Sequence, residues 1–261
     1  MNVLLVTAGK AVAWPVREAL GAVAGVRAVA VVEVPEPAGR AELDPALDSL
    51  GDRRLVVAGS AAALGDIVTR LLRRDELGST PVGVILGTAT RASHRDDRSS
   101  AVVEPGAAAN DPPADLAAAA RIAATGVPGP TDLIRDDHGG VLLDRAELAP
   151  WTGRRLGMRV YVDDTRLVNG EIPGLAVVHP GGGGVRAEVW PERTRWRRPR
   201  RGTRGAPRAS AVGRAVQVSC EQARLTLDGR VHPRPVTRRN WWLEPGRWLL
   251  VRPPEDATAH R

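Results

Sequence analysis

The sequence is poor in cysteine, in lysine and in aromatic residues other than tryptophan. It has no Phe, one Tyr and seven Trp, so its core must be built mostly from Val, Leu and Ala. A single cysteine, Cys220, excludes an intrachain disulfide and a metal cage made of cysteines. Lys10 is the one lysine beside 36 arginines, which indicates a GC-rich genome more than a binding preference.

Long apolar runs are also missing. No run reaches the roughly 18 residues that a transmembrane helix needs. Residues 1–9 are apolar, but no basic segment precedes them and no small-residue cleavage site follows. They predict a first strand rather than a signal peptide, and we expect a cytoplasmic protein.

Two kinds of catalytic or metal motif are absent from the sequence. The five histidines do not have the spacing of metal ligands. No G-x-S-x-G sequence is present, so nothing indicates a serine hydrolase.

The 261 residues suffice for one large or two modest domains, and their charge is uneven. Residues 1–130 carry 13 basic and 15 acidic side chains, whereas residues 131–261 carry 24 and 15. The net charge of +7 therefore comes from the second half. A basic half predicts a partner with an acidic surface, and anionic lipid and nucleic acid are the two candidates.

The first half alternates between apolar strands and amphipathic helices. Its spacing predicts a parallel sheet covered on both faces, which is a three-layer α/β domain. The strands expected are 2–7, 29–34 (fully buried), 55–58 and 81–86, and the helices are 12–24, 42–50, one beginning after Ser60, and 115–125.

After Leu133 the pattern changes to short strands separated by turns, which predicts a β-sandwich-like domain. The turn signals are Asp136–Gly140, Asn169-Gly170 and Asp228-Gly229. The strands expected are 140–143, 158–162, 175–178, 185–190, 215–220, 224–227 and 248–251. We predict an α/β domain at 1–127, a β-rich domain at 128–254 and a tail at 255–261.

Two strand–turn–helix units suggest a phosphate site. In the first, an apolar strand ends at Gly59 and Ser60 and a helix follows. In the second, Pro81–Leu86 runs into the turn Gly87-Thr88-Ala89-Thr90. Free N–H groups and the helix dipole make such turns suitable for anions.

These two units resemble the diacylglycerol kinase catalytic family, which has G-G-D-G-T-L-N-E-V-V at the first turn and P-L-G-T-G-N-D at the second. Residues 59–68, GSAAALGDIV, follow the first pattern in step. However, Ala61 replaces the family's Asp and Ala62 a Gly. In the second turn Gly87 and Thr88 match, but the three residues after them do not.

The resemblance implies ATP-dependent phosphorylation of a lipid hydroxyl with Mg²⁺. It implies that Gly59, Ser60, Ala61, Asp66, Gly87 and Thr88 line the nucleotide site, with Asp66 matching the family's Glu. The loss of the carboxylate at Ala61 predicts a weakened or lost nucleotide site. A catalytically inactive protein that binds lipid or a partner is the alternative.

The second domain offers one catalytic candidate. Asp228-Gly229 matches the family's D-G-E, whose Asp acts as general base on the lipid hydroxyl, with Arg230 in place of Glu. The same two residues between strands also predict a simple hairpin turn. The Gly181–Gly184 run precedes a strand rather than a helix, so we expect a hairpin loop there.

An arginine-rich segment, 193–208, contains eight arginines close to Trp190 and Trp196. Three interpretations stay open: a solvated loop, contact with an anionic membrane, and nucleic-acid binding. The resemblance implies a peripheral location at the inner membrane face. A second copy of the chain, forming a homodimer, is a further candidate partner.

Overall fold

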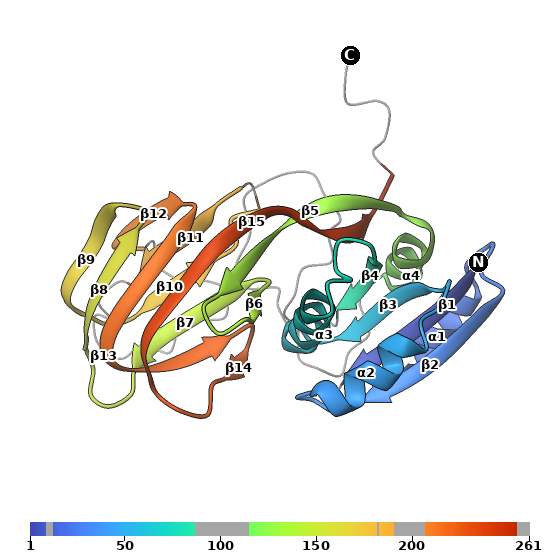
Figure 1. Cartoon of the computed structure of the whole chain (residues 1–261), viewed down its shortest axis with the longest axis horizontal. Helices are drawn as coiled ribbons and strands as arrows, with labels where there is room; N and C mark the ends of the chain where they lie inside the picture. Colours follow the sequence, from blue (N-terminus) through green and yellow to red (C-terminus); the bar gives the residue numbers. More distant parts are fainter. Residues whose placement is uncertain (9–12, 87–114, 182, 191–206, 255–261) are drawn as a thin grey trace, which may run out of the picture. The chain divides into compact units, whose positions relative to one another are not determined.

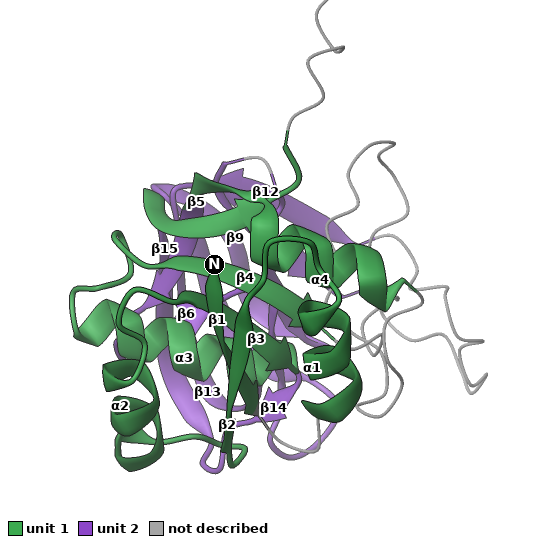
Figure 2. Cartoon of the chain, turned by 90° about the vertical axis from the view of Figure 1, so that its right-hand side faces the viewer, with its two compact units in different colours: residues 1–131, 246–261 green, residues 132–245 purple. Residues whose placement is uncertain are grey.

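We describe the chain from a computed structural model. The structure describes residues 1–8, 13–86, 115–181, 183–190 and 207–254, and Figure 1 shows their helices and strands. They form two compact units, residues 1–131 with 246–261, and residues 132–245 (Figure 2).

The first unit contains a parallel sheet in the order β4-β3-β1-β2. Its strands are β1 (Asn2–Ala8), β2 (Ala28–Val34), β3 (Arg54–Gly59) and β4 (Pro81–Leu86). The end of β15 (Val236–Arg252) adds a parallel partner to β4, with Leu249 opposite Pro81. The predicted α/β class is confirmed.

Helices cover both faces of this sheet. The helices α1 (Ala13–Gly21) and α4 (Leu116–Thr125) pack on the face that presents Val3 and Leu5. The helices α2 (Arg40–Asp48) and α3 (Ala61–Arg73) lie on the opposite face (Figure 2). The three-layer arrangement follows from right-handed crossovers between parallel strands.

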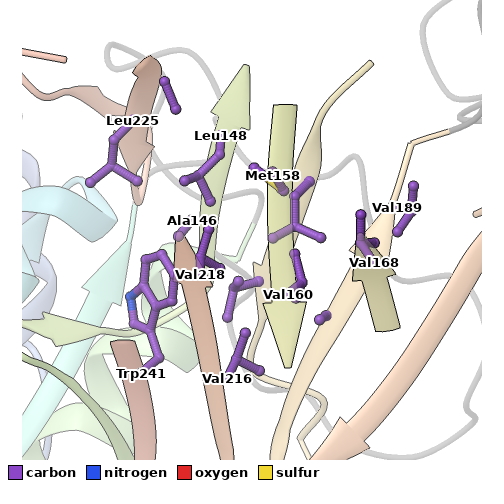
Figure 3. Close-up of a cluster of buried hydrophobic side chains, with 14 of the residues drawn as sticks. Ala146, Leu148, Met158, Val160, Val168, Val189, Val216, Val218, Leu225 and Trp241 are labelled. Carbon is purple, nitrogen blue, oxygen red and sulfur yellow. The ribbon is translucent and has the colours of Figure 1, made fainter. Parts of the chain in front are cut away.

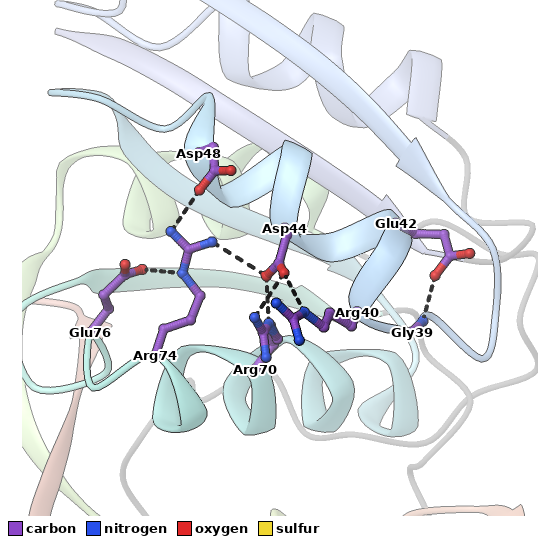
Figure 4. Close-up of polar contacts among 8 residues, drawn as sticks. All are labelled: Gly39, Arg40, Glu42, Asp44, Asp48, Arg70, Arg74 and Glu76. Carbon is purple, nitrogen blue, oxygen red and sulfur yellow. Dashed lines mark hydrogen bonds and ion pairs between the residues drawn. The ribbon is translucent and has the colours of Figure 1, made fainter.

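A carboxylate joins α2 to α3. Asp44 is an ion-pair partner of Arg40, Arg70 and Arg74, and Arg74 also pairs with Asp48 and Glu76 (Figure 4). The Arg70 guanidinium is the main cause of a lowered pKa at the Asp44 carboxyl, and Arg40 and Arg74 lower it further. The two helices are therefore held together by charge as well as by apolar packing.

The strand β2 departs from the expectation of full burial. It pairs with β1 alone among the described residues, and Val29, Val31 and Val32 are only half-buried. An edge strand lacks a neighbour on one side, which explains the difference.

The second unit is built from antiparallel strands, as expected of a sandwich. They are β5 (Val127–Asp136), β6 (Val141–Leu142), β7 (Arg145–Pro150), β8 (Leu156–Val162), β9 (Thr165–Ile172), β10 (Leu175–Val178), β11 (Val185–Val189), β12 (Ala209–Gly213), β13 (Ala215–Leu227), β14 (Arg230–Val231) and the first part of β15.

One strand belongs to both layers of this unit. The first half of β13 pairs with β8 and its second half with β7, and the register shifts between Ser219 and Ala223. Apolar side chains from both layers meet between them (Figure 3). Val160, Val216 and Leu148 are fully buried in this cluster.

Several strand boundaries differ from the sequence prediction. The strands predicted at 215–220 and 224–227 are one strand, because a bulge rather than a turn lies between them. The predicted turn Asn169-Gly170 lies inside β9, where Gly170 pairs with Met158. The strand predicted at 248–251 is the end of the 17-residue β15.

The first unit is not continuous in sequence, whereas the domains predicted at 1–127 and 128–254 each were. Residues 246–252 of β15 belong to the first unit because they pair with β4. Within the described residues, no helix is long and apolar enough to cross a bilayer.

Candidate functional site

The first predicted phosphate turn has the expected local structure. β3 ends at Gly59, Ser60 caps α3 by accepting a 3.1 Å hydrogen bond from Ala63 N, and α3 follows. The helix forms because Leu64, Ile67, Val68 and Leu71 make one apolar face, and all four are at most 4% exposed.

The sheet order places this turn where ligands bind in open α/β sheets. β1 connects to β2 on one side, whereas β3 connects to β4 on the other. The crevice at the carboxyl ends of two such strands is the usual ligand position. Gly59 is paired with Leu86, so the two predicted turns follow neighbouring strand ends.

A carboxylate from the β2–α2 loop already contacts this turn. The Ser60 hydroxyl donates a 2.7 Å hydrogen bond to Glu36 Oε1. Asp66 accepts a 3.1 Å hydrogen bond from Ala38 N, which fixes the same loop to α3. Ser60 and Asp66, which were predicted to bind nucleotide, therefore form hydrogen bonds with the β2–α2 loop of the chain itself.

Ala61 and Ala62, the remaining predicted residues that the structure describes, add no metal ligand. Ala61 and Ala62 are each 8% exposed, so their methyl groups are largely packed inside. Gly87 and Thr88 lie outside the described residues. No cluster of three acidic, histidine or cysteine side chains suited to a metal occurs among the residues described. The described part of the turn does not fit Mg²⁺.

The predicted base, Asp228, lies at the tip of a two-residue hairpin between β13 and β14. Leu227 pairs with Arg230, and both Asp228 and Gly229 have positive φ, of 48° and 87°. This geometry is the type I′ turn that Asp-Gly favours. The hairpin interpretation of these residues is confirmed, and their catalytic role stays a prediction.

The Asp228 carboxylate is bound by backbone N–H groups. It accepts hydrogen bonds from Leu143, Asp144 and Arg145 at 2.9–3.0 Å, and its own N–H donates to Arg145 O. Burial raises the pKa of Asp228 to about 6, which the three donors oppose and the Asp144 charge reinforces. A carboxyl of this kind titrates close to neutral pH.

Sequence reasoning missed two groups around Asp228. Asp144 follows β6 and supplies one of the N–H donors, and His179 N donates to Asp144 O. Burial lowers the pKa of His179, whose Nδ1 accepts a hydrogen bond from Gly181 N. Neither residue belongs to a recognisable motif, so only the pairing of β7 with β10 places them together.

Two further predicted segments, the Gly181–Gly184 run and the arginine-rich segment, add no residue to the candidate site as described. A strand, β11, follows the Gly181–Gly184 run, as expected for a hairpin loop. Most of the arginine-rich segment 193–208 lies outside the described residues.

The fold is shared with two solved kinases. A diacylglycerol kinase structure from Bacillus anthracis str. Sterne matches with a TM-score of 0.62 and 11% identity, over 97% of each chain. An NAD kinase from Archaeoglobus fulgidus, solved with ATP, matches with a TM-score of 0.53 and 12% identity, over 96% of this chain and 92% of that one. The sequence matches no protein-family model and no curated protein.

At these identities the likeness establishes a kinase-like fold. The predicted resemblance to diacylglycerol kinases is thus supported at the level of fold, and NAD kinases share it.

Proposed function

We propose that this chain is a diacylglycerol kinase-like protein that binds anionic lipid and transfers little or no phosphate. The observation that carries the proposal is the 2.7 Å hydrogen bond from Ser60 to Glu36. A carboxylate at the start of a helix takes the place that suits a phosphate and repels a second anion. Ala61 offers no carboxylate to recruit Mg²⁺ in compensation.

The outer face of the second unit supports the lipid part of the proposal. The register of β9, β8, β13 and β15 puts Arg159, Arg166, Arg238 and Tyr161 on one exposed sheet face. No ion pair engages these three guanidinium groups anywhere in the described chain. Each basic group near an anionic leaflet contributes about 1 kcal/mol, and tyrosine suits the membrane interface.

The test combines three measurements on the full-length protein. We expect sedimentation with phosphatidylglycerol-containing vesicles that decreases with salt, and none with phosphatidylcholine alone. We expect no shift in melting temperature with millimolar Mg-ATP, and no transfer of labelled phosphate to diacylglycerol. Reversing the charge of Arg159, Arg166 and Arg238 together should abolish sedimentation, whereas Arg121→Glu on α4 should not. Retardation of oligonucleotides without vesicle binding would favour nucleic acid instead.

An active lipid kinase is the second candidate, and the raised pKa of Asp228 favours it, because a base near neutral pH can accept a hydroxyl proton. This candidate predicts a melting shift of several degrees with Mg-ATP and phosphorylation of a lipid hydroxyl. Gly59→Trp, which blocks the turn, should remove the shift, and Asp228→Asn should remove the phosphorylation. Those results would replace our proposal.

A further inference from the structure

The strand β2 is an open, apolar sheet edge. Its seven residues, AVAVVEV, contain one charge, Glu33, and neither proline nor lysine. Among the described residues it pairs with β1 alone. Natural sheets protect such an edge with charges, proline, a bulge or a cover, since unpaired N–H and C=O groups otherwise recruit another strand.

Charged groups that make no ion pair in the described structure lie near both ends of this edge. Arg27 immediately precedes β2, Glu33 lies near its end, and Arg17 stacks on Trp14 of α1. None of the three makes an ion pair within the described structure. Arg17 and Arg27 both line a hollow of about 340 Å³ whose lining contains no acidic residue.

We propose that a second copy of this chain covers the edge, with the two β2 strands antiparallel about a twofold axis at Ala30. An isologous pair of this kind brings the same patch of both subunits together. Ala30 then lies opposite Ala30 of the partner subunit, Val29 opposite Val31 of the partner subunit, and Arg27 opposite Glu33 of the partner subunit.

The charges decide this register. Val29 and Val31 pack against the core cluster that contains α1, so Arg27 and Glu33, at the same parity, lie on that face as well. A twofold axis normal to the sheet keeps the α1 side of both subunits on the same face of the joined sheet. Glu33 of the partner subunit therefore comes to Arg27, at the hollow that Arg17 also lines. The twofold axis makes this pair of opposite charges form twice.

Sedimentation equilibrium tests the pairing. The wild type should show twice the chain mass of 27.7 kDa at micromolar concentration. Arg27→Glu and Glu33→Arg should each weaken the dimer at least about tenfold, because like charges then face each other across both pairs. The double variant should restore wild-type affinity, and Arg121→Glu on α4 should leave the dimer affinity unchanged. A monomeric wild type, or a double variant as weak as the single ones, would overturn the proposal.

Cysteine cross-linking tests the register without relying on charge. In a Cys220→Ser background, Ala30→Cys should form an interchain disulfide on mild oxidation, because the two side chains lie opposite each other. Val32→Cys, opposite Ala28 of the partner subunit, should not. Equal cross-linking of both variants, or none with Ala30→Cys, would exclude the axis at Ala30.

Discussion

Asp163 and Asp228 make the same kind of contact at the tips of two different hairpins. Both have positive φ, of 51° and 48°. The Asp163 carboxylate accepts hydrogen bonds from Arg214 N and Ala215 N, at the start of β13, as Asp228 does from the start of β7. Each side chain thus fastens a neighbouring strand to a hairpin, and this structural role does not depend on catalysis.

Replacing Asp228 with glycine should lower the free energy of unfolding by about 2 kcal/mol, because three partly buried N–H groups lose their acceptor. Glycine adopts positive φ without strain, so the loss in the free energy of unfolding measures the contribution of the carboxylate. Asp163→Gly is the matched control, and its cost should be about 1 kcal/mol or less, since water reaches that exposed turn. Urea denaturation measures both. Equal costs would argue against burial as the cause.

The raised pKa of Asp228 predicts a pH dependence of stability. The native carboxyl has a pKa of about 6, while an unfolded Asp titrates near 3.9. The unfolded chain therefore loses its proton first as pH rises, and native stability falls between about pH 4 and pH 6. Relative to Asp228→Asn, the wild type should be more stable at pH 4 than at pH 7.5. A difference between the two proteins that is constant with pH would contradict the assigned pKa.

Removing the Glu36 carboxylate should open the first turn to anions. We expect Glu36→Ala to bind inorganic phosphate or Mg-ATP about 2- to 5-fold more tightly than the wild type, the range that one charge at a helix terminus supplies. The loop should keep its place through the hydrogen bond between Ala38 and Asp66. Isothermal titration gives the affinities, with Glu18→Ala on α1 as control. Unchanged affinity would mean that Glu36 does not block the turn.

Close packing of α4 on the sheet depends on Gly83. A Cβ at this position would lie 2.4 Å from Ala123 O, so Gly83→Ala must displace the helix. We expect a loss of about 1–3 kcal/mol in the free energy of unfolding. Gly129→Ala, which meets no atom within 4 Å, should change stability by less than about 0.5 kcal/mol. Thermal or urea unfolding separates the two variants.

The first unit was predictable because its signals are local. Pro81–Leu86 is continuously apolar, as expected of a buried parallel strand, and forms β4 with those bounds. Asp115 caps α4 by accepting a hydrogen bond from Ala118 N, and Gly126 follows the last residue of the helix, as predicted. Apolar residues recur at different spacings in strands and in helices. The alternation of the two patterns along the chain was therefore sufficient to predict the α/β fold class.

The features that the sequence could not reveal depend on contacts between residues far apart in the chain. Glu36 lies 24 residues before Ser60, and only the sheet order brings its loop to α3. The bulge in β13 resembles a turn because Glu221 and Gln222 are polar and exposed there. The edge position of β2 likewise depends on which strands become neighbours, and apolar residues alone do not indicate that.

The pairing of Leu249 with Pro81 links the order of synthesis to the order of folding. Leu249 lies 168 positions after Pro81, so β4 receives this neighbour only when the end of the chain leaves the ribosome. Until then we expect this edge of β4 to lack its strand partner. An expression fragment that stops after α4 would keep that edge permanently open and should aggregate, so the first unit is best studied within the whole protein.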